Sequence, residues 1–297
     1  SCLAADALAG GLSGLGLRIR VIGTPAEEKG GGKIALLRAG VFDGVDAAMM
    51  AHAGFVSLPA RDMLGHRRIR AEFRARAGDP VANAQDAAAL CLHAVETLRR
   101  GLPNRMRLEA VLAEGGRFSS GAAIRARPDY GRAVAEFVVQ GTAAPALLAY
   151  ERRIADFARA AARLAGATVR WQGQWGRYLP MRRNAALEDA YARSLRAIRE
   201  PIGVFPADVA IGSTDCGNVS HALPAIHPYF KTVGFEAGID HHTPEYAAVG
   251  VSPEGFAGLR SAARALALTA FEFAADPTLR RRVWQDFRAA GPPLAVD

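Results

Sequence analysis

Two adjacent carboxylates, Glu27 and Glu28, follow an apolar run and a short turn-forming stretch. The apolar run, Leu17–Ile22, is predicted to be a strand, and open α/β sheets carry their functional sites at the carboxyl ends of strands. At such a place one carboxylate can hold a metal ion while the other stays free as the general base for a metal-bound water. A bare Glu-Glu pair is more often two solvated loop acids, so the pair needs partners to become a site.

Histidines are the expected partners of this carboxylate pair. His52 follows the apolar strand predicted at Val45–Met50, which places its imidazole at the same sheet edge as Glu27 and Glu28. Four of the seven histidines fall in one polar stretch, at His221, His227, His241 and His242. A carboxylate with two or three imidazoles is a donor set that suits zinc or manganese. His52 and His242 are therefore the candidate imidazole ligands.

Two other polar motifs lack the residue spacing of a phosphate-binding loop or of a site for covalent catalysis. The run Gly30–Lys33 lacks the Gly-x-x-x-x-Gly-Lys-Ser/Thr spacing of a phosphate loop, because Ile34 follows the lysine, so its glycines are expected to open the next helix. The loop Ser213–Asn218 offers a serine and a cysteine as nucleophiles. It has neither a Gly-x-Ser-x-Gly elbow nor a protease-type context around Cys216, which disfavours covalent catalysis.

The elements that must position these residues are expected from hydrophobic periodicity and turn signals. Helices are expected to about Leu12, before Gly40, and at Asn83–Arg100, Ala146–Leu164 and Asn184–Glu200, with two Arg/Ala helices at the end. Strands are expected at Leu17–Ile22, Val45–Met50, Arg68–Ala75, Met106–Ala113, Ala133–Val139, Ala167–Gln172 and Val209–Ile211, and a polar loop region at Gly212–Tyr246.

This order of elements divides the chain into three parts. Residues 1–65 alternate strands and helices, which is typical of a parallel sheet in an α/β layer. Residues 66–173 have the order β-α-β-β-α-β of a ferredoxin-like unit, and residues 174–297 return to α/β character. The expected fold class is therefore α/β: a partial catalytic α/β/α sandwich with an inserted ferredoxin-like α+β domain.

Composition narrows the classes of function. Half of the 297 residues are hydrophobic and 22% are charged, which fits a globular chain of about two domains and excludes a disordered one. No apolar stretch approaches the ~18–20 residues of a membrane helix, so no membrane partner is expected. All but three of the 37 basic residues are arginines, but most have acids close by, so nucleic acid is not an expected partner. Three widely spaced cysteines fit a reducing, cytoplasmic compartment.

The chemistry-bearing stretches together resemble one known family. They are Gly23–Lys33, Gly40–Asp43, Met50–His52, Gly212–Ser220, Ile226–Phe230 and His242–Tyr246. They are similar to the metal-dependent amidohydrolase and dipeptidase family of the aminoacylases, and most similar to its branch with aminobenzoyl-glutamate hydrolase and the β-alanyl-lysine-type dipeptidase. The resemblance covers nearly the whole chain, and its Glu-Glu-x-Gly-Gly-Gly-Lys motif is quite specific.

The resemblance implies roles for individual residues. Glu27 corresponds to the general base, and Glu28, His52 and His242 correspond to metal ligands. The implied reaction is hydrolysis of the amide bond in an N-acyl amino acid or small dipeptide, and Asp215 and His227 are expected to bind the substrate. The inserted domain is expected to act as a lid and to form a homodimer, through an edge strand near Arg68–Ala75 or through the helix that begins at Asn83.

Three departures from the family pattern bear on activity. A Cys-Gly-His motif that supplies a thiolate and an imidazole is expected just upstream of Ser1, so the chain is expected to lack the front of the family's catalytic domain. The lid histidine that steadies the oxyanion is missing where Ala77–Pro80 runs into Asn83, and a substrate-contacting asparagine is replaced by Arg125 in Ile124–Pro128. One ion is therefore expected rather than two, and a non-catalytic, degenerate or truncated family member is the alternative.

Overall fold

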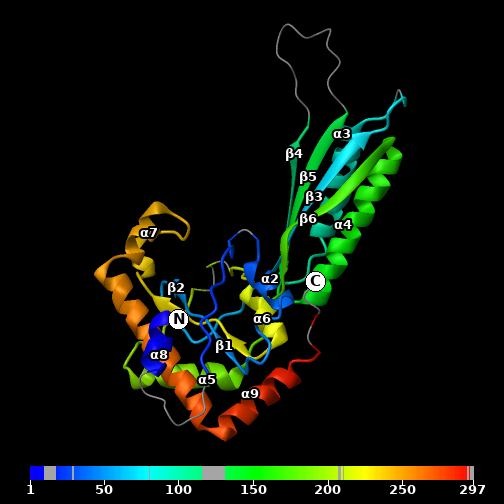
Figure 1. The fold of residues 1–297 in the computed structure, drawn as a ribbon. Helices are drawn as coiled ribbons and strands as arrows, with labels where there is room; N and C mark the ends of the chain where they lie inside the picture. The colour runs from blue at the N-terminus through cyan, green and yellow to red at the C-terminus, as the bar shows by residue number, and fades with distance from the viewer. Residues whose placement is uncertain are drawn as a thin grey trace.

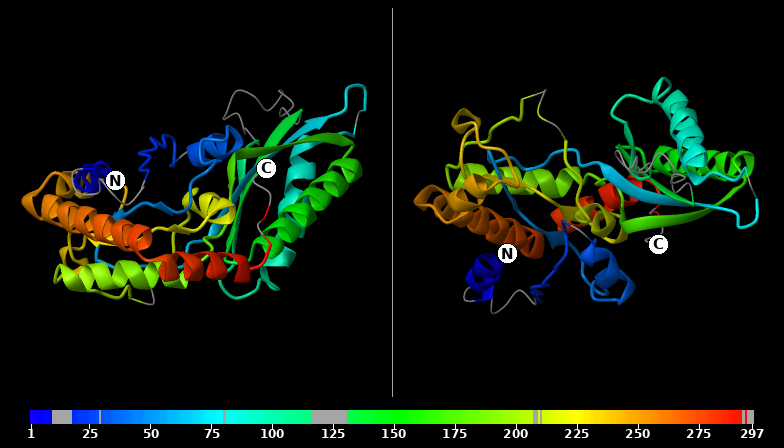
Figure 2. Two further views of the ribbon diagram at one scale, coloured as in Figure 1. Left: turned by 60° about the horizontal axis from the view of Figure 1, so that its bottom comes forward. Right: turned by 90° about the horizontal axis from the view of Figure 1, so that it is seen from above.

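The computed structural model describes residues 1–9, 18–28, 30–79, 81–115, 131–206, 209, 211–292 and 294, without the side chains of residues 174 and 175. Figure 1 shows a sheet flanked by helices that projects from a body of helices and short strands. The two further views in Figure 2 place the sheet unit and the body at opposite ends of an elongated molecule. Two sequence predictions, the end of the first helix near Leu12 and the Arg125 segment, lie outside the described residues.

The projecting unit has the expected order β-α-β-β-α-β. In chain order its elements are β3 (Gly65–Ala75), α3 (Ala84–Arg99), β4 (Arg107–Glu114), β5 (Arg132–Gly141), α4 (Ala144–Leu164) and β6 (Ala167–Tyr178). The strands form one antiparallel sheet in the order β4-β5-β3-β6. All six elements predicted for this region are confirmed, but β6 runs past residue 173, where the sequence division ends the inserted domain.

Buried and partly exposed residues alternate along β3, which explains why helices cover only one face of this sheet. Ile69, Ala71 and Phe73 are fully buried among α3 and α4, while the residues between them are partly exposed on the other face. The side chain of Asn83 caps α3 by accepting hydrogen bonds from two amide groups of the first turn. Because β3 is an inner strand, the expectation that the strand near residues 68–75 is a dimerisation edge is wrong.

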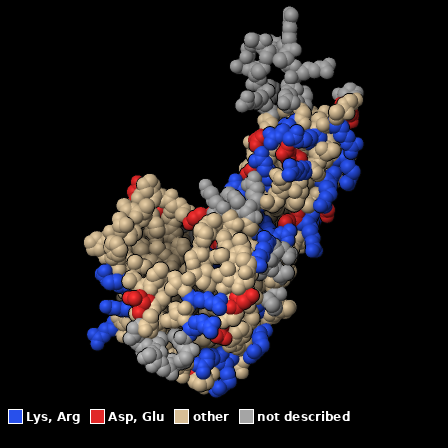
Figure 3. All heavy atoms as spheres, viewed as in Figure 1, with Lys and Arg blue, Asp and Glu red and all other residues tan. Residues whose placement is uncertain are grey.

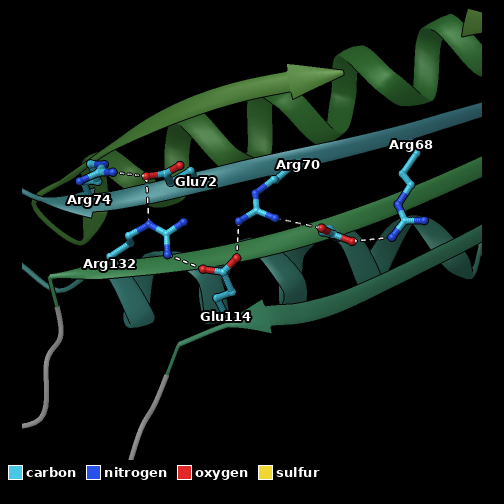
Figure 4. Close-up of polar contacts among 7 residues, drawn as sticks. Arg68, Arg70, Glu72, Arg74, Glu114 and Arg132 are labelled. Carbon is cyan, nitrogen blue, oxygen red and sulfur yellow. Dashed lines mark hydrogen bonds and ion pairs between the residues drawn. The ribbon is translucent and has the colours of Figure 1, made fainter. Parts of the chain in front are cut away.

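The open face of this sheet carries an alternating chain of charges. Successive ion-pair partners across β3, β5 and β4 are Arg74, Glu72, Arg132, Glu114, Arg70, Glu136 and Arg68 (Figure 4). Figure 3 shows blue Lys and Arg side chains gathered over the projecting unit, with red Asp and Glu side chains among them. The guanidinium groups in this chain are therefore neutralised by neighbouring carboxylates.

The body holds two separate pairs of short parallel strands in place of one continuous sheet. The pairs are β1 (Ala48–Met49) with β7 (Ala225–Ile226), and β2 (His52–Gly54) with β8 (Tyr229–Lys231). The strand predicted at Val45–Met50 is thus only two residues long, and His52 opens the next strand instead of following the first.

Other expectations for the body differ from the structure. Residues 18–22 form no strand, because no described strand lies beside them to share hydrogen bonds. Residues 209 and 211 are also outside any strand, and residue 210 lies outside the described part. The region 212–246, expected to be loop, contains helix α6 (Cys216–Ala222) and both β7 and β8. Its backbone groups pair with the strands that follow α2 (Gly32–Arg38), which polarity along this stretch alone does not predict.

Helices close the body around its own core. They are α1 (Cys2–Ala9), α5 (Ala185–Ala197), α7 (Pro244–Gly250), α8 (Pro253–Ala275) and α9 (Pro277–Ala289). Tyr191, Leu195, Leu266 and Phe273 are among the residues buried between α5, α8 and α9. None of the described helices is long and apolar enough to cross a membrane.

Candidate functional site

The loop that carries the paired glutamates is folded back tightly on itself. Ala26 has a positive φ of 59°, and the Gly31 amide donates a hydrogen bond to the Ala26 carbonyl at 2.9 Å. A Cβ added to Gly32 would lie only 1.9 Å from the Pro25 carbonyl oxygen, so the two ends of the loop touch through backbone alone. The glycines predicted to open the next helix do so, because Gly32 is the first residue of α2.

Glu27 is half-buried and held from two sides. The Tyr178 hydroxyl, at the end of β6, donates a hydrogen bond to its backbone carbonyl at 2.5 Å. The Thr214 side chain is a hydrogen-bond partner of its carboxylate. Burial raises the pKa of Glu27 above 4.5, and the nearby negative charges of Asp215 and Glu28 add to the rise, whereas Thr214 and Lys33 oppose it. The result is a carboxylate with an increased tendency to take up a proton.

Asp215 lies behind Glu27 in a buried ion pair. Its Oδ1 atom is 2.7 Å from Lys33 Nζ, and its Oδ2 atom accepts a hydrogen bond from the Lys33 amide at 3.0 Å. The side chains of Lys33 and Asp215 are 4% and 0% exposed. The sequence predicts that Asp215 binds substrate; the structure places its carboxylate against Lys33 and away from solvent.

Glu28 and His242 are brought together across the surface of the site. Glu28 Oε2 lies 3.3 Å from His242 Nε2, and both side chains are mostly exposed. His242 has a positive φ of 63° and comes directly before Thr243, whose side chain caps α7. The sharp turn before this helix therefore presents the imidazole toward the glutamate loop.

Three more imidazoles gather around β2 and β8, and one of them, His241, also lies near His242, with ring centroids 6.5 Å apart. The His52 ring centroid lies 5.4 Å from that of His227 and 6.1 Å from that of His241. His241 also stacks on Phe55 at 4.5 Å. His52 faces the Tyr229 ring at 5.2 Å, since the two residues are register partners in the parallel pair. The cluster thus places His52 and His227 side by side, as their neighbouring strands require.

His227 is the buried member of this cluster. Both of its ring nitrogens are buried without a hydrogen-bond partner among the described residues, and so is Nε2 of His241. Burial lowers the pKa of His227 to about 3, with smaller contributions from His52 and Lys33, so its imidazole is neutral at physiological pH. An orphaned nitrogen in such a place is suited to a hydrogen bond with a bound molecule.

The described residues test whether a metal ion fits here. Two donors on one tetrahedral zinc, with bonds of about 2.0–2.2 Å, lie roughly 3.3–3.6 Å apart. The 3.3 Å separation of Glu28 and His242 therefore fits two positions of one ion. Within the described part of the chain, however, no three His, Cys, Asp or Glu side chains converge closely enough to hold a metal. The pair fits an ion, and the full ligand set is not assembled.

A cavity of about 720 Å³ lies on another side of the glutamate loop. It is lined by α1, residues 18–22, the strand β1 and one side of α8, and it touches the loop through Thr24 and Lys33. Neither Glu27 nor Glu28 lines it, and the candidate histidines do not either. The candidate site residues therefore lie outside this cavity, which polar and apolar side chains line together.

Comparisons with known proteins connect this geometry to a family. No family model matches the chain. It is 31% identical over 283 residues to Xaa-Arg dipeptidase of Homo sapiens, a match that covers 92% of the chain and 62% of that protein. Xaa-Arg dipeptidase of Mus musculus is 30% identical over 284 residues, with 92% and 63% covered. The chain is a homologue of these two dipeptidases. It spans about three fifths of the length of these two relatives.

Solved structures share the fold of this dipeptidase homologue. A dinuclear metal-binding peptidase of the M20 family from Bacillus subtilis superposes with a TM-score of 0.56 at 15% identity, covering 83% of this chain and 63% of the other. An aminobenzoyl-glutamate utilization protein from Klebsiella pneumoniae gives a TM-score of 0.54 at 15% identity, covering 81% and 57%. At these identities the likeness shows a shared fold. The family resemblance predicted from the sequence is confirmed by the dipeptidase relatives.

Sequence reasoning missed the residues that support the glutamate loop in this homologue. Lys33 ends the Glu-Glu-x-Gly-Gly-Gly-Lys motif, but the motif does not show its partner, because Asp215 is 182 positions away. Tyr178 and Thr214 contact Glu27 from equally distant parts of the chain. A buried lysine at the start of a helix indicates that a carboxylate partner exists. It does not indicate where in the sequence that partner lies.

Proposed function

We propose that this chain takes part in hydrolysis of the amide bond in N-acyl amino acids or small dipeptides, with Glu27 as the general base. The observation that carries the proposal is the contact of Glu28 with His242 at 3.3 Å, next to the half-buried Glu27. The 31% identity to Xaa-Arg dipeptidase supports the same reaction class.

The metal site of this proposal is built on the exposed pair. Glu28 and His242 would hold a divalent ion, zinc or manganese, with His52 as a third ligand by family resemblance, and one ion is proposed for this chain. Such an ion, when bound, supplies Lewis-acid polarisation of the scissile carbonyl. His52 Nδ1 contacts the Ala53 carbonyl at 2.5 Å, which leaves its Nε2 as the atom available for ligation.

Glu27 would move the proton in this reaction. Its carboxylate is held by Thr214, and its raised pKa brings its proton affinity closer to neutral pH, where general bases work best. We propose that a Glu27 carboxylate oxygen takes a proton from the attacking water and returns it to the nitrogen of the leaving amine. Burial on one side leaves the Glu27 carboxylate incompletely solvated, which raises its affinity for a proton from the attacking water.

His227 is proposed to bind the substrate. A neutral, buried imidazole with unpartnered nitrogens among the described residues can donate one hydrogen bond to a carbonyl or carboxylate oxygen. Its neighbour His52 keeps it next to the proposed metal site, with ring centroids 5.4 Å apart. Asp215 is fully buried against Lys33, and it is proposed to support the site without contacting the substrate.

A homodimer through the four-stranded unit is also proposed. Since β3 is an inner strand, the available edge strands are β4 and β6. The strand β4 exposes Val111 and Leu112, which are 55% and 47% accessible, and an apolar edge strand favours pairing with a second copy. Light scattering on wild type and Val111→Lys tests this, because the substitution should shift a dimer toward monomer. A wild-type monomer at all concentrations would contradict it.

The activity test is a panel of dipeptides and N-acyl amino acids, including dipeptides with C-terminal arginine, incubated with the chain and zinc or manganese. Released amino acids are quantified by mass spectrometry. Glu27→Gln should lower turnover by about a hundredfold or more, because loss of a general base costs about that much. The control is Glu254→Gln, an exposed glutamate in the first turn of α8. Hydrolysis that persists unchanged in Glu27→Gln, or no hydrolysis of any substrate by wild type, would overturn the proposal.

A further inference from the structure

A buried clamp joins the glutamate loop to helix α6. The carboxylate of Asp215, the residue before α6, receives both the ammonium group and the backbone amide of Lys33. Lys33 is the second residue of α2, so one carboxylate fixes the start of that helix through two bonds at 2.7 and 3.0 Å. Two segments that are 182 positions apart in the chain are thereby locked together.

The clamp acts where Glu27 is held. Thr214, the hydrogen-bond partner of the Glu27 carboxylate, is the neighbour of Asp215 in the chain, and both are buried. The Thr214 hydroxyl oxygen also accepts a hydrogen bond from the Cys216 amide at 3.2 Å. The position of Thr214 therefore depends on the same turn that presents Asp215 to Lys33.

A buried ion pair of this kind is poorly explained by stability alone. Removing two charges from water is unfavourable, and apolar replacements of similar volume are often as stable. In some proteins such a pair fixes one geometry for the segments that it joins. Here those segments are the loop that carries Glu27 and the turn that carries its partner Thr214.

We infer that Lys33 and Asp215 are positioning residues that hold Glu27 and Thr214 in register for catalysis without touching the substrate. This inference rests on the proposed role of Glu27 as general base. It predicts that the pair can be replaced with little loss of folding but with a loss of order in the glutamate loop.

The decisive variant is the double substitution Lys33→Met with Asp215→Asn. It removes both charges together, so neither partner is left buried and unpaired, and the fold is expected to survive. The single variant Asp215→Asn leaves the Lys33 ammonium group buried without a negatively charged partner, so it should destabilise the fold more than the double variant does. The control is Glu272→Gln, which breaks the ion pair of Arg193 with Glu272 at 2.5 Å between α5 and α8.

Hydrogen–deuterium exchange followed by mass spectrometry reads loop order without needing activity. Peptides that span residues 24–33 should exchange faster in the double variant than in wild type, and should be unchanged in Glu272→Gln. Wild-type exchange of these peptides in the double variant would overturn the inference. Uniformly faster exchange throughout the chain would overturn it as well, because that indicates general destabilisation only. If the double variant does not fold, Thr214→Val, which removes only the hydroxyl, is subjected to the same comparison.

Steady-state kinetics separates positioning from a merely structural role. The double variant should lose about tenfold to a hundredfold in kcat, with KM within about twofold of wild type, because a misplaced base impairs chemistry more than binding. Unchanged kcat would contradict the inference. If wild type hydrolyses nothing, the proposed function fails, and the exchange experiment alone decides whether Lys33 and Asp215 order the loop.

Discussion

Replacing Gly32 by alanine tests how the loop of the two glutamates is closed. A Cβ on Gly32 would lie 1.9 Å from the Pro25 carbonyl oxygen, whereas real Cβ atoms do not come closer than 3.0 Å. The two ends of the loop must therefore separate by at least 1.1 Å. Because the nearby atom belongs to the backbone, no side-chain rotation can relieve the contact.

The expected loss of stability follows from this forced separation. Overpacking in a well-packed region costs about 1–3 kcal/mol. For chains approaching this size, each kcal/mol lowers the melting temperature by about 2–4 °C, so Gly32→Ala should melt roughly 2–12 °C below wild type.

Thermal unfolding followed by circular dichroism measures the effect. The matched control is Gly23→Ala in the same loop, where an added Cβ meets no atom within 4 Å. The control should melt within about 1 °C of wild type, since surface substitutions without contacts usually change stability by under about 0.5 kcal/mol. If Gly32→Ala melted with the control, the close approach of Pro25 and Gly32 would be refuted.

Three further substitutions test other parts of the fold. Burial lowers the pKa of His221 to about 4, below the ordinary 6.5. As the pH falls, the unfolded chain therefore takes up the proton before the folded chain does. The free energy of unfolding should fall between pH 6.5 and 4 by up to about 1.4 kcal/mol per pH unit. In urea titrations at several pH values, the free energy of unfolding of His221→Gln should depend less on pH. Hydrogen bonding from Arg132 lowers the pKa of Glu72 below 4.5, so this stabilisation is present above pH 4.5 and lost at lower pH. Acid unfolding of Glu72→Gln should be less steep than that of wild type, and an identical profile would contradict the ion-pair chain. Asn83→Ala should destabilise the chain by about 1 kcal/mol, measured by urea unfolding, because it removes the cap of α3.

The four-stranded unit could be predicted from the sequence because its signals are local. Strand β3 alternates strictly, and α3 lies between an Asn83 cap and a Gly-Leu-Pro stop. The order in which the strands pair could not be predicted in this way, because nothing in the sequence of β3 itself shows that it lies inside the sheet. In the body, two- and three-residue strands such as β7 and β8 are too short to carry periodicity, and they form only through their partners β1 and β2.

The candidate site divides in the same way. The approach of Glu28 to His242 agrees with a pattern that the sequence suggested, and the family is confirmed by the dipeptidase relatives. The roles of Glu27, Glu28, His52 and His242 remain predictions. The buried environment of Asp215 depends on Lys33 at a distance of 182 residues, and no local pattern encodes such a contact.

Zinc content per chain tests the central claim most directly. Wild type, Glu28→Ala and the control Glu254→Ala are equilibrated with zinc chloride, desalted and analysed by elemental mass spectrometry. The account predicts about one retained ion per chain in wild type and in the control, and loss of that ion in Glu28→Ala, because the carboxylate and His242 share it. No retained zinc in wild type, or equal retention in Glu28→Ala, would contradict a metal site at Glu28 and His242.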